Sequence, residues 1–347
     1  DSRVFVVRCP DYDHVEERMA DLLDLMGGMG RFAAPGDQLV LKVSLLLAAE
    51  PERAVTTHPA VVAAVGRMAR AEGARPVIAD SPGSSNPYNE LALRRIYDAS
   101  GMFDAAQQAG IEVNLDTTYQ AISFPEGRLT KRLEVISPVV GSDGVLSLCK
   151  LKTHAYMGMT GAIKNSFGVI PGRTKAGYHA KLADPAHFAG MLLDVSAHVA
   201  PRLSIMDAVV GMEGDGPSAG TPRRIGLLLA SEDPLALDVV ASEIIGLPRA
   251  SNQVLLEAER QGLTPTRIEE IDLVGMDVTT LAIPDFQLPV TFLGGGGFGA
   301  VPWWQRMLVP LFRDGLSVRP QVIPEKCVAC GACRDACPVQ VISIGRD

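Results

Sequence analysis

Residues 37–80 of the chain, DQLVLKVSLLLAAEPERAVTTHPAVVAAVGRMARAEGARPVIAD, decide the fold. Two short apolar runs, at 37–43 and 75–80, flank a helical pattern at 58–73. Pro59 stands at the first helical position and Gly73 lies just past the last, as capping preferences favour. A strand, a helix and a strand in this order predict two parallel strands joined by a crossover helix.

The same alternation continues on both sides of this unit. Strand patterns lie at 3–7, 111–115, 203–210 and 223–231, and helical patterns at 13–26, 89–110 and 234–247. They predict an α/β fold of mainly parallel sheets with helices on both faces, in Rossmann-like lobes. We expect an α/β core over residues 1–282, as one unit or as two lobes. A connector rich in Gly, Pro and aromatic residues should follow over 283–320, and a small C-terminal ferredoxin-like iron–sulfur module over 321–347.

Composition restricts the class of partner. The chain has 347 residues, 47% of them hydrophobic, which is enough to fill a large core. Its formal net charge of −8 argues against non-specific nucleic-acid binding, which requires a basic face. No apolar run approaches the ~18 residues that cross a bilayer, and the N-terminus has no secretory pattern. We therefore expect a cytoplasmic protein without a membrane or nucleic-acid partner.

Four of the six cysteines lie in the segment 327–340, CVACGACRDACPVQ. The spacing C-x2-C-x2-C-x3-C-P is that of bacterial ferredoxins, so it predicts a [4Fe–4S] cluster as cofactor. In two-cluster ferredoxins the first three cysteines of each run hold one cluster and the fourth ligates the cluster of the other run. The predicted metal ligands are Cys327, Cys330, Cys333 and Cys337.

One cysteine run leaves the fourth ligand of the cluster open. Two copies of the chain can pair as half-ferredoxins, so that each Cys337 completes the cluster of the other copy. A second run can follow beyond Asp347 in a longer chain. Alternatively, Cys9 or Cys149 supplies the ligand from within the core.

Residues 144–183 contain five lysines and one arginine but no Asp or Glu, in a chain that is acidic overall. The segment predicts a buried strand ending near Cys149, then a loop, then a helix that begins near Thr160 or Gly161. Free N–H groups at a helix start favour an anion, and nearby lysines add charge. The alternative is a solvated face that balances acidic neighbours. We predict a site for a small anionic substrate, a carboxylate or a phosphate.

Two histidines and two loops complete the predicted site. His154 and His179 titrate near neutrality, and adjacent lysines would keep them neutral and suited to general-base catalysis. The loops after the strands at 75–80 and 203–210 bring carboxylates to the same sheet edge. The predicted catalytic residues are His154, His179 and Lys152. The predicted substrate-binding residues are Lys152, Thr160, Gly161, Lys164, Asn165, Lys175, Asp80, Ser81, Glu213 and Asp215.

Several of these motifs resemble one known family. They are LKVSLLLAAEPERAVTTHP (41–59), VIADSPG (77–83), KLKTHAYMGMTGAIKNSFGVIPG (150–172) and GMEGDGP (211–217), with the cysteine run. Together they resemble the domain-of-unknown-function family 362, which are iron–sulfur proteins of bacteria and archaea. The resemblance implies a ferredoxin module, which in relatives often has two cysteine runs, but it implies no activity.

The leading hypothesis is an iron–sulfur oxidoreductase that passes electrons between a [4Fe–4S] cluster and a small anionic substrate. A non-catalytic electron-transfer or sensor protein is one alternative, and a non-redox isomerase or transferase with a structural cluster is another. The expected partners are the substrate and either a redox partner protein or a second copy of the chain. The sequence leaves the substrate, the reduction potential and the oligomeric state open.

Overall fold

The computed structural model describes residues 2–83, 85–277 and 280–289, together with residues 327, 330, 331 and 333. Most of the predicted connector, and the module apart from those four positions, lie outside the described residues. The division into core, connector and module therefore stays a prediction.

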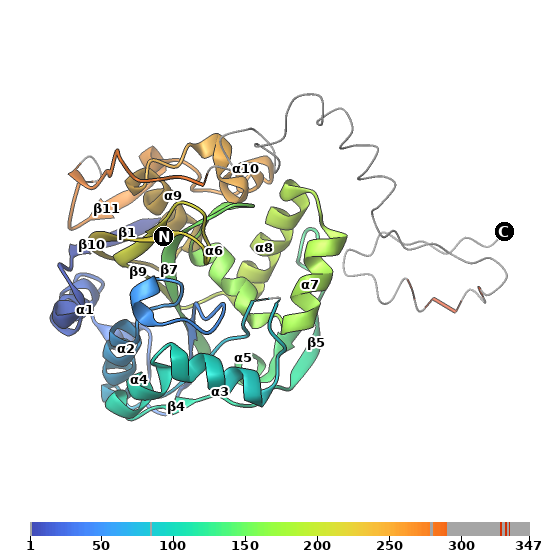
Figure 1. The fold of residues 1–347 in the computed structure, drawn as a ribbon, viewed down its shortest axis with the longest axis horizontal. Coiled ribbons are helices and arrows are strands. Elements are labelled where there is room, and N and C mark those ends of the chain that lie inside the picture. The colour runs from blue at the N-terminus through green and yellow to red at the C-terminus, as the bar shows by residue number, and fades with distance from the viewer. Residues whose placement is uncertain are drawn as a thin grey trace.

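One mixed sheet runs through the described chain in the strand order β11-β1-β10-β9-β7-β2-β3-β4, and β8 pairs with β7 (Figure 1). Five neighbouring strands are parallel: β4 (Glu112–Val113), β3 (Arg75–Ala79), β2 (Gln38–Val43), β7 (Gly144–His154) and β9 (Leu203–Glu213). On the far side, β10 (Thr221–Ser231) is antiparallel to both β9 and β1 (Arg3–Arg8). β11 (Asp272–Val274) lies parallel to β1 at the edge. The predicted mainly parallel α/β fold is confirmed.

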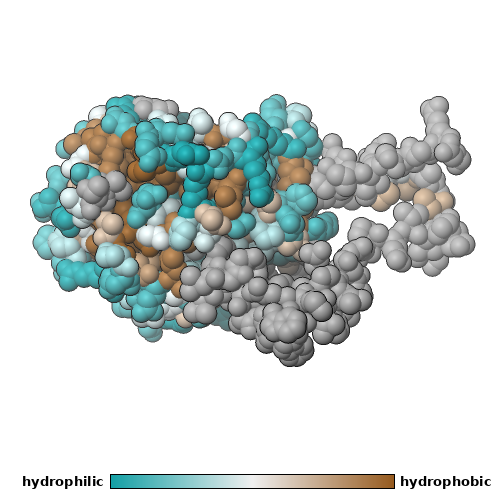
Figure 2. All heavy atoms as spheres, turned by 90° about the horizontal axis from the view of Figure 1, so that it is seen from above, coloured by the Kyte–Doolittle hydropathy of each residue, from teal (hydrophilic) through white to brown (hydrophobic). Residues whose placement is uncertain are grey.

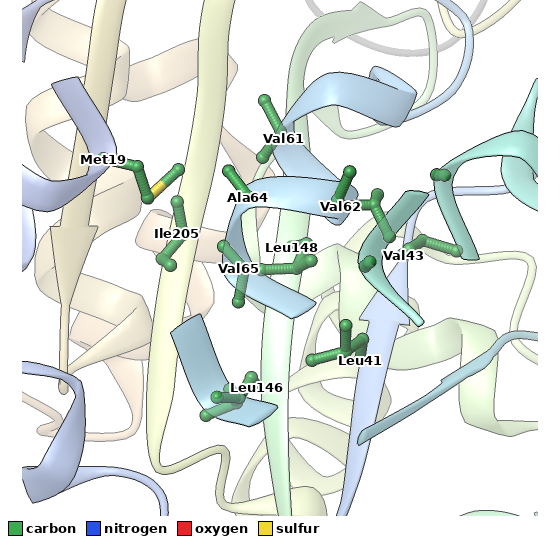
Figure 3. Close-up of a cluster of buried hydrophobic side chains, with 14 of the residues drawn as sticks. Met19, Leu41, Val43, Val61, Val62, Ala64, Val65, Leu146, Leu148 and Ile205 are labelled. Atoms are coloured by element: carbon green, nitrogen blue, oxygen red, sulfur yellow. The ribbon is translucent and has the colours of Figure 1, made fainter. Parts of the chain in front are cut away.

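Helices cover both faces of this sheet, as its alternating side chains require. In β2, Leu39, Leu41 and Val43 join the core under α1 (Val15–Leu25) and α2 (Pro59–Ala71), and Val40 joins the core on the other face. The second face packs on α8 (Pro185–Val199) and α9 (Pro234–Ile244). Figure 3 shows the α2 side chain Val65 among Leu41, Leu146 and Leu148.

The remaining elements surround this framework. They are α3 (Glu90–Ala99), α4 (Met102–Ala109), α5 (Ser137–Val140), α6 (Ala162–Asn165), α7 (Gly172–Lys181), α10 (Gln253–Arg260), β8 (Gly158–Thr160) and the two-stranded sheet of β5 (Tyr119–Ser123) and β6 (Arg132–Ile136). In the described part of the face shown in Figure 2, hydrophobic residues are interspersed with hydrophilic ones. Among the described residues, no helix has the length and hydropathy to span a membrane.

Candidate functional site

A cavity of about 190 Å³ lies at the carboxyl ends of β2, β3 and β7. Small molecules bind α/β sheets at this edge. The cavity brings together nine of the residues predicted from the sequence. They are Asp80, Ser81, Lys152, His154, Thr160, Lys164, Asn165, Lys175 and His179. Lys42, Ser44, Gly168 and Pro217 also line it, and these were not among the predicted site residues.

Strand β7 extends beyond the end of its neighbour β2, and this extension carries Lys152 and His154. It pairs with β2 only as far as Leu148, and then turns back on itself through β8. In this hairpin Lys152 lies opposite Thr160 and His154 lies opposite Gly158. Gly158 has φ +90°, a conformation that favours glycine, and it allows the tight return. The predicted strand therefore continues past Cys149 and holds the site residues itself.

Lys150 on the same strand belongs to a different cluster. Its Nζ lies 2.8 Å from Asp207 Oδ2, and both side chains are fully buried. It also donates to the Tyr12 hydroxyl at 2.8 Å. The pairing of β7 with β9 is irregular between Lys150 and Lys152, so the two lysines have different surroundings.

Lys42 and Asp80 form a buried ion pair on the cavity wall, with Nζ 3.0 Å from Oδ1. Lys42 Nζ also donates to the Val43 carbonyl at 2.6 Å and to Asn165 Oδ1 at 3.2 Å. All three donors of this ammonium are used, so it has none left for a ligand. Burial lowers the pKa of Lys42, and Asp80 opposes that change.

Asn165 supports the ion pair rather than the cavity. Its Nδ2 donates to the Lys42 carbonyl at 3.2 Å and to Ser147 Oγ at 3.0 Å. With Oδ1 bound to Lys42, the side chain is committed to these two residues. We predicted that Asn165 binds the substrate directly, but the geometry gives it the role of fixing Lys42.

Gly168 closes the same wall because no larger residue fits there. A Cβ at this position would overlap the Asp80 carboxylate and the Lys42 ammonium. The Gly168 carbonyl accepts the Ser81 N–H at 2.9 Å, which fixes the loop after β3.

Three further lysines reach the cavity without a carboxylate partner. Lys152 donates to Ser44 Oγ at 3.1 Å and to the Val55 carbonyl at 2.6 Å. Lys175 donates to the carbonyls of Ser81 and, at 2.8 Å, Pro82. Within the described part of the chain, Lys164 Nζ makes no hydrogen bond or ion pair. One donor on Lys152, one on Lys175 and three on Lys164 therefore stay available.

The missing carboxylates change how these lysines titrate. Burial, followed by Lys164 and Lys150, lowers the pKa of Lys152 to about 7. Burial lowers the pKa of Lys175 to about 7, against the opposing effect of Asp80. Burial and Lys42 lower the pKa of Lys164 to about 8. An anion in the cavity would restore the charge of all three.

The two histidines present opposite ring nitrogens. His154 Nδ1 accepts the backbone N–H groups of Tyr156 at 3.1 Å and Met157 at 3.2 Å, which places its proton on Nε2. His179 Nδ1 donates to the Lys175 carbonyl at 2.8 Å, which leaves a lone pair on Nε2. His154 is thus a hydrogen-bond donor to the cavity and His179 an acceptor.

Burial first, and then Lys164, lowers the pKa of both histidines. For His179 the bond to the Lys175 carbonyl opposes the change. His154 is buried, whereas His179 is exposed at one edge, with its ring packed against Phe188 at 4.5 Å between centroids. Both rings are therefore neutral near pH 7.

Two hydroxyls complete the lining. Ser81 Oγ and Thr160 Oγ1 are buried, and neither has a hydrogen-bond partner within the described residues. A buried hydroxyl without a partner costs free energy, so both are poised to bind a ligand atom.

The helix start predicted as an anion site is already occupied. α6 begins after Gly161, as predicted, but the buried carboxylate of Asp238 on α9 accepts the N–H groups of Ala162 at 2.6 Å and Ile163 at 3.1 Å. Gly161 faces Asp238, and a Cβ there would overlap its carboxylate. The expectation of free N–H groups for a substrate at Gly161 is therefore wrong.

The acidic loop after β9 lies largely outside the cavity. Glu213 Oε2 accepts the Gln287 N–H at 3.0 Å, and the Gly214 N–H donates to the Gln287 carbonyl at 2.6 Å. Glu213 thus anchors the described segment 280–289 to the end of β9, and Asp215 is exposed. We predicted that both bind substrate, but only Pro217 of this loop lines the cavity.

The cysteines divide into two environments. Cys327, Cys330 and Cys333 are exposed, and Cys337 lies outside the described residues. Cys149 is fully buried, with Sγ 3.5 Å from the Ile205 carbonyl, and burial raises its pKa. Cys9 is also buried, and burial raises its pKa to about 12.

The described residues contain no preformed group of three or more His, Cys, Asp and Glu for a metal ion. The cysteine spacing and exposure fit a [4Fe–4S] cluster, whereas the two buried thiols are poor candidates for its fourth ligand.

Comparison with known proteins agrees with both parts of the chain. The model of the domain of unknown function DUF362 matches residues 39–243, and that of a 4Fe-4S binding domain matches residues 320–343. The chain is 36% identical over 255 residues to the thylakoid-associated protein sll1697 of Synechocystis sp., covering 72% of this chain and 75% of that protein.

The lactate racemase apoprotein of Thermoanaerobacterium thermosaccharolyticum is a solved structure that matches with a TM-score of 0.44 and 10% identity, covering 70% of this chain and 56% of that one. The 4Fe-4S match identifies the C-terminal segment as a [4Fe–4S]-binding region, as the cysteine spacing predicts. Since the family model covers more than half of the sequence, the chain belongs to the DUF362 family.

Proposed function

We propose that this protein is an iron–sulfur oxidoreductase that binds a small anionic substrate in the lysine-lined cavity. One observation carries the proposal: Lys152, Lys164 and Lys175 converge on the cavity without a carboxylate partner. Uncompensated ammonium groups destabilise a folded protein unless a ligand neutralises them. Their presence is therefore best explained by a bound anion.

The size of the cavity restricts the substrate. A cavity of 150 Å³ holds benzene, so about 190 Å³ accommodates roughly six to ten non-hydrogen atoms. Nicotinamide dinucleotides and flavins are several times larger. Electrons for a reaction here must therefore come from a carrier outside the cavity, and the C-terminal [4Fe–4S] region supplies or accepts them one at a time.

The residues of the cavity divide the remaining work. Lys164 and Lys152 hold the anion, and Lys175 completes its neutralisation. His154 donates the Nε2 proton in a hydrogen bond to a substrate oxygen, and His179 accepts a proton on Nε2. The general-base role predicted for both histidines is assigned to His179 alone.

Redox turnover tests this proposal. The full-length protein is purified anaerobically, its cluster is reduced with dithionite, and small carboxylates and phosphates are screened for re-oxidation of the visible cluster band. We expect at least one to re-oxidise the cluster in wild type and in Lys181→Gln, an exposed lysine of the same segment, but not in Lys164→Gln. Equal rates in both variants would contradict the role of the cavity.

A second candidate function rests on the opposite tautomers of His154 and His179. A proton donor and a proton acceptor around one anion also suit an isomerase, which needs no electrons. Cys330→Ser, which removes a predicted cluster ligand, separates the two. Substrate conversion that persists in this variant supports the isomerase, and conversion that stops supports the oxidoreductase. Binding without turnover in the wild type supports a sensor.

A further inference from the structure

Two groups of residues with similar chemistry, here called arms, line the cavity, and Lys164 lies close enough to both to lower the pKa of one lysine and one histidine in each. The first is the β7–β8 hairpin, which contributes Lys152, Thr160 and His154. The second contains Lys175 and His179, one turn apart on α7, and the Ser81 loop to which Lys175 donates. Each arm therefore has one lysine, one hydroxyl without a partner and one histidine.

The donors available to a ligand outnumber the acceptors. The hairpin arm offers three: one from Lys152, the Thr160 hydroxyl and His154 Nε2–H. The α7 arm offers one from Lys175 and the Ser81 hydroxyl, and Lys164 offers three more. Acceptors are fewer: His179 Nε2 and the oxygens of the same two hydroxyls. A ligand that fits this set consists mainly of hydrogen-bond-accepting oxygens.

Charge counting leads to the same kind of molecule. The Lys42–Asp80 pair is internally neutral, so Lys152, Lys164 and Lys175 are the cations that a ligand must balance. A monoanion would leave two of them without a counter-charge in a desolvated site, and a dianion leaves one.

We infer that the substrate class is a small dianion whose anionic oxygens contact both arms and Lys164, and that its binding is accompanied by proton uptake. This inference rests on the proposed function, because it specifies the ligand of the same cavity. Dicarboxylates and phosphates share this chemistry, and the experiment below separates them.

Proton uptake follows from the neighbours of Lys164. The charged and titratable groups around it come from three elements and one loop: Lys42 on β2, Asp80 after β3, Lys152 and His154 on β7, and Lys175 and His179 on α7. With one carboxylate among them, a fraction of the lysines is neutral at about pH 8, since their pKa values lie near 7 to 8. A bound dianion raises these values, so protons are taken up. Below about pH 6 the lysines are already charged, and their share of the uptake should vanish.

Isothermal titration calorimetry of the full-length protein at about pH 8 tests the inference. The probes are succinate, inorganic phosphate and butyrate, a monoanion with the same carbon chain as succinate. Titration in Tris and in HEPES, whose ionisation enthalpies differ, gives the number of protons taken up. Lys164→Gln reports on the cavity and Lys181→Gln is the matched control.

We expect succinate or phosphate to bind at least about thirty-fold more tightly than butyrate, because a further charge-assisted contact adds that factor. The tighter of the two identifies the dianion as a carboxylate or a phosphate. The tighter binding should be lost in Lys164→Gln and kept in Lys181→Gln, with net proton uptake in the wild type. Butyrate binding as tightly as both dianions, or no proton uptake, would overturn the inference but leave an anion site in place. Binding by none of the probes at millimolar concentration, or binding unaffected by Lys164→Gln, would overturn the anion site and with it the proposed function.

Discussion

Replacing Lys164 with Met should stabilise the ligand-free protein while removing anion binding. The Lys164 ammonium has no hydrogen bond or ion pair within the described residues, so removing it leaves no buried partner unsatisfied. This distinguishes it from Lys152 and Lys175, whose removal would leave the carbonyls that they bind without donors. Methionine keeps the length and apolar stem of the side chain without its charge.

The magnitude follows from the pKa of Lys164, which burial and Lys42 lower from 10.5 to about 8. At ~1.4 kcal/mol per pH unit, holding this group charged costs at most about 3 kcal/mol at pH 7. The side chain keeps some solvent contact, and screening reduces the cost to about 1–2 kcal/mol. Because the pKa in the folded state lies below that in the unfolded chain, the cost is complete below about pH 8 and vanishes towards pH 10.5. The gain from Met should therefore fall by about half between pH 7 and pH 9.5.

Thermal unfolding followed by far-UV circular dichroism measures this gain. For a core of this size, 1–2 kcal/mol raises the apparent Tm by about 2–6 °C. Lys181→Met, on the exposed end of α7, should stay close to the wild type. The reasoning fails if Lys164→Met melts below the wild type at both pH values, because the ammonium would then contribute to the fold rather than to a ligand.

Three further predictions concern the supports of the cavity and the cluster. Burial raises the pKa of Asp238 to about 7, above its unfolded value, so its contribution to stability is complete below about pH 4 and is lost as the pH rises through 7. Relative to Asp238→Asn, the wild type should therefore lose about 2 kcal/mol of unfolding free energy between pH 5.5 and 8.5, as measured by urea unfolding. A difference that stays constant over this pH range would contradict this. Gly168→Ala should destabilise the protein by about 1–3 kcal/mol and weaken succinate or phosphate binding in calorimetry, because a Cβ at this position overlaps the ion pair on the cavity wall. Gly177→Ala is the control, since a Cβ there has open space and the substitution should be neutral or stabilising. Equal effects of the two substitutions would argue against a crowded cavity wall. Cys337→Ser should lose iron and EPR signal and Cys149→Ser should retain both, and the reverse result would make Cys149 the ligand.

The fold is predictable from the sequence because its signals are local. The strand at 38–43, the helix at 59–71 and the strand at 75–79 each lie within one short window of apolar pattern and capping residues. The antiparallel insertion of β10 between β9 and β1 has no such signal. Which strands become neighbours depends on packing across the whole sheet, and an apolar run such as 227–230 pairs equally well in either direction.

In the candidate site, too, residues with a local sequence signal could be predicted, and residues that act on distant parts of the chain could not. Lys152, Lys164 and Lys175 share one acid-free segment, and that local asymmetry is enough to single them out. Lys42 and Asp238 carry no comparable signal, because each acts on a residue far away in the chain: Lys42 bonds Asn165 across 123 positions, and Asp238 caps Ala162 across 76. A buried lysine within an apolar strand is the one clue to Lys42, since such a residue requires a partner.

The position of β1 also has a consequence for synthesis on the ribosome. β1 ends at Arg8, and its partner β10 begins at Thr221, about 210 residues later. At roughly 5–20 residues per second, the first strand waits on the order of ten to forty seconds for that partner, and longer for β11. During this interval its apolar residues Val4, Phe5 and Val6 have no sheet to join. The nascent chain is therefore expected to need protection by a chaperone until nearly all of the core has emerged, and a ribosome stalled between β9 and β10 should carry a β1 segment that proteases can cut.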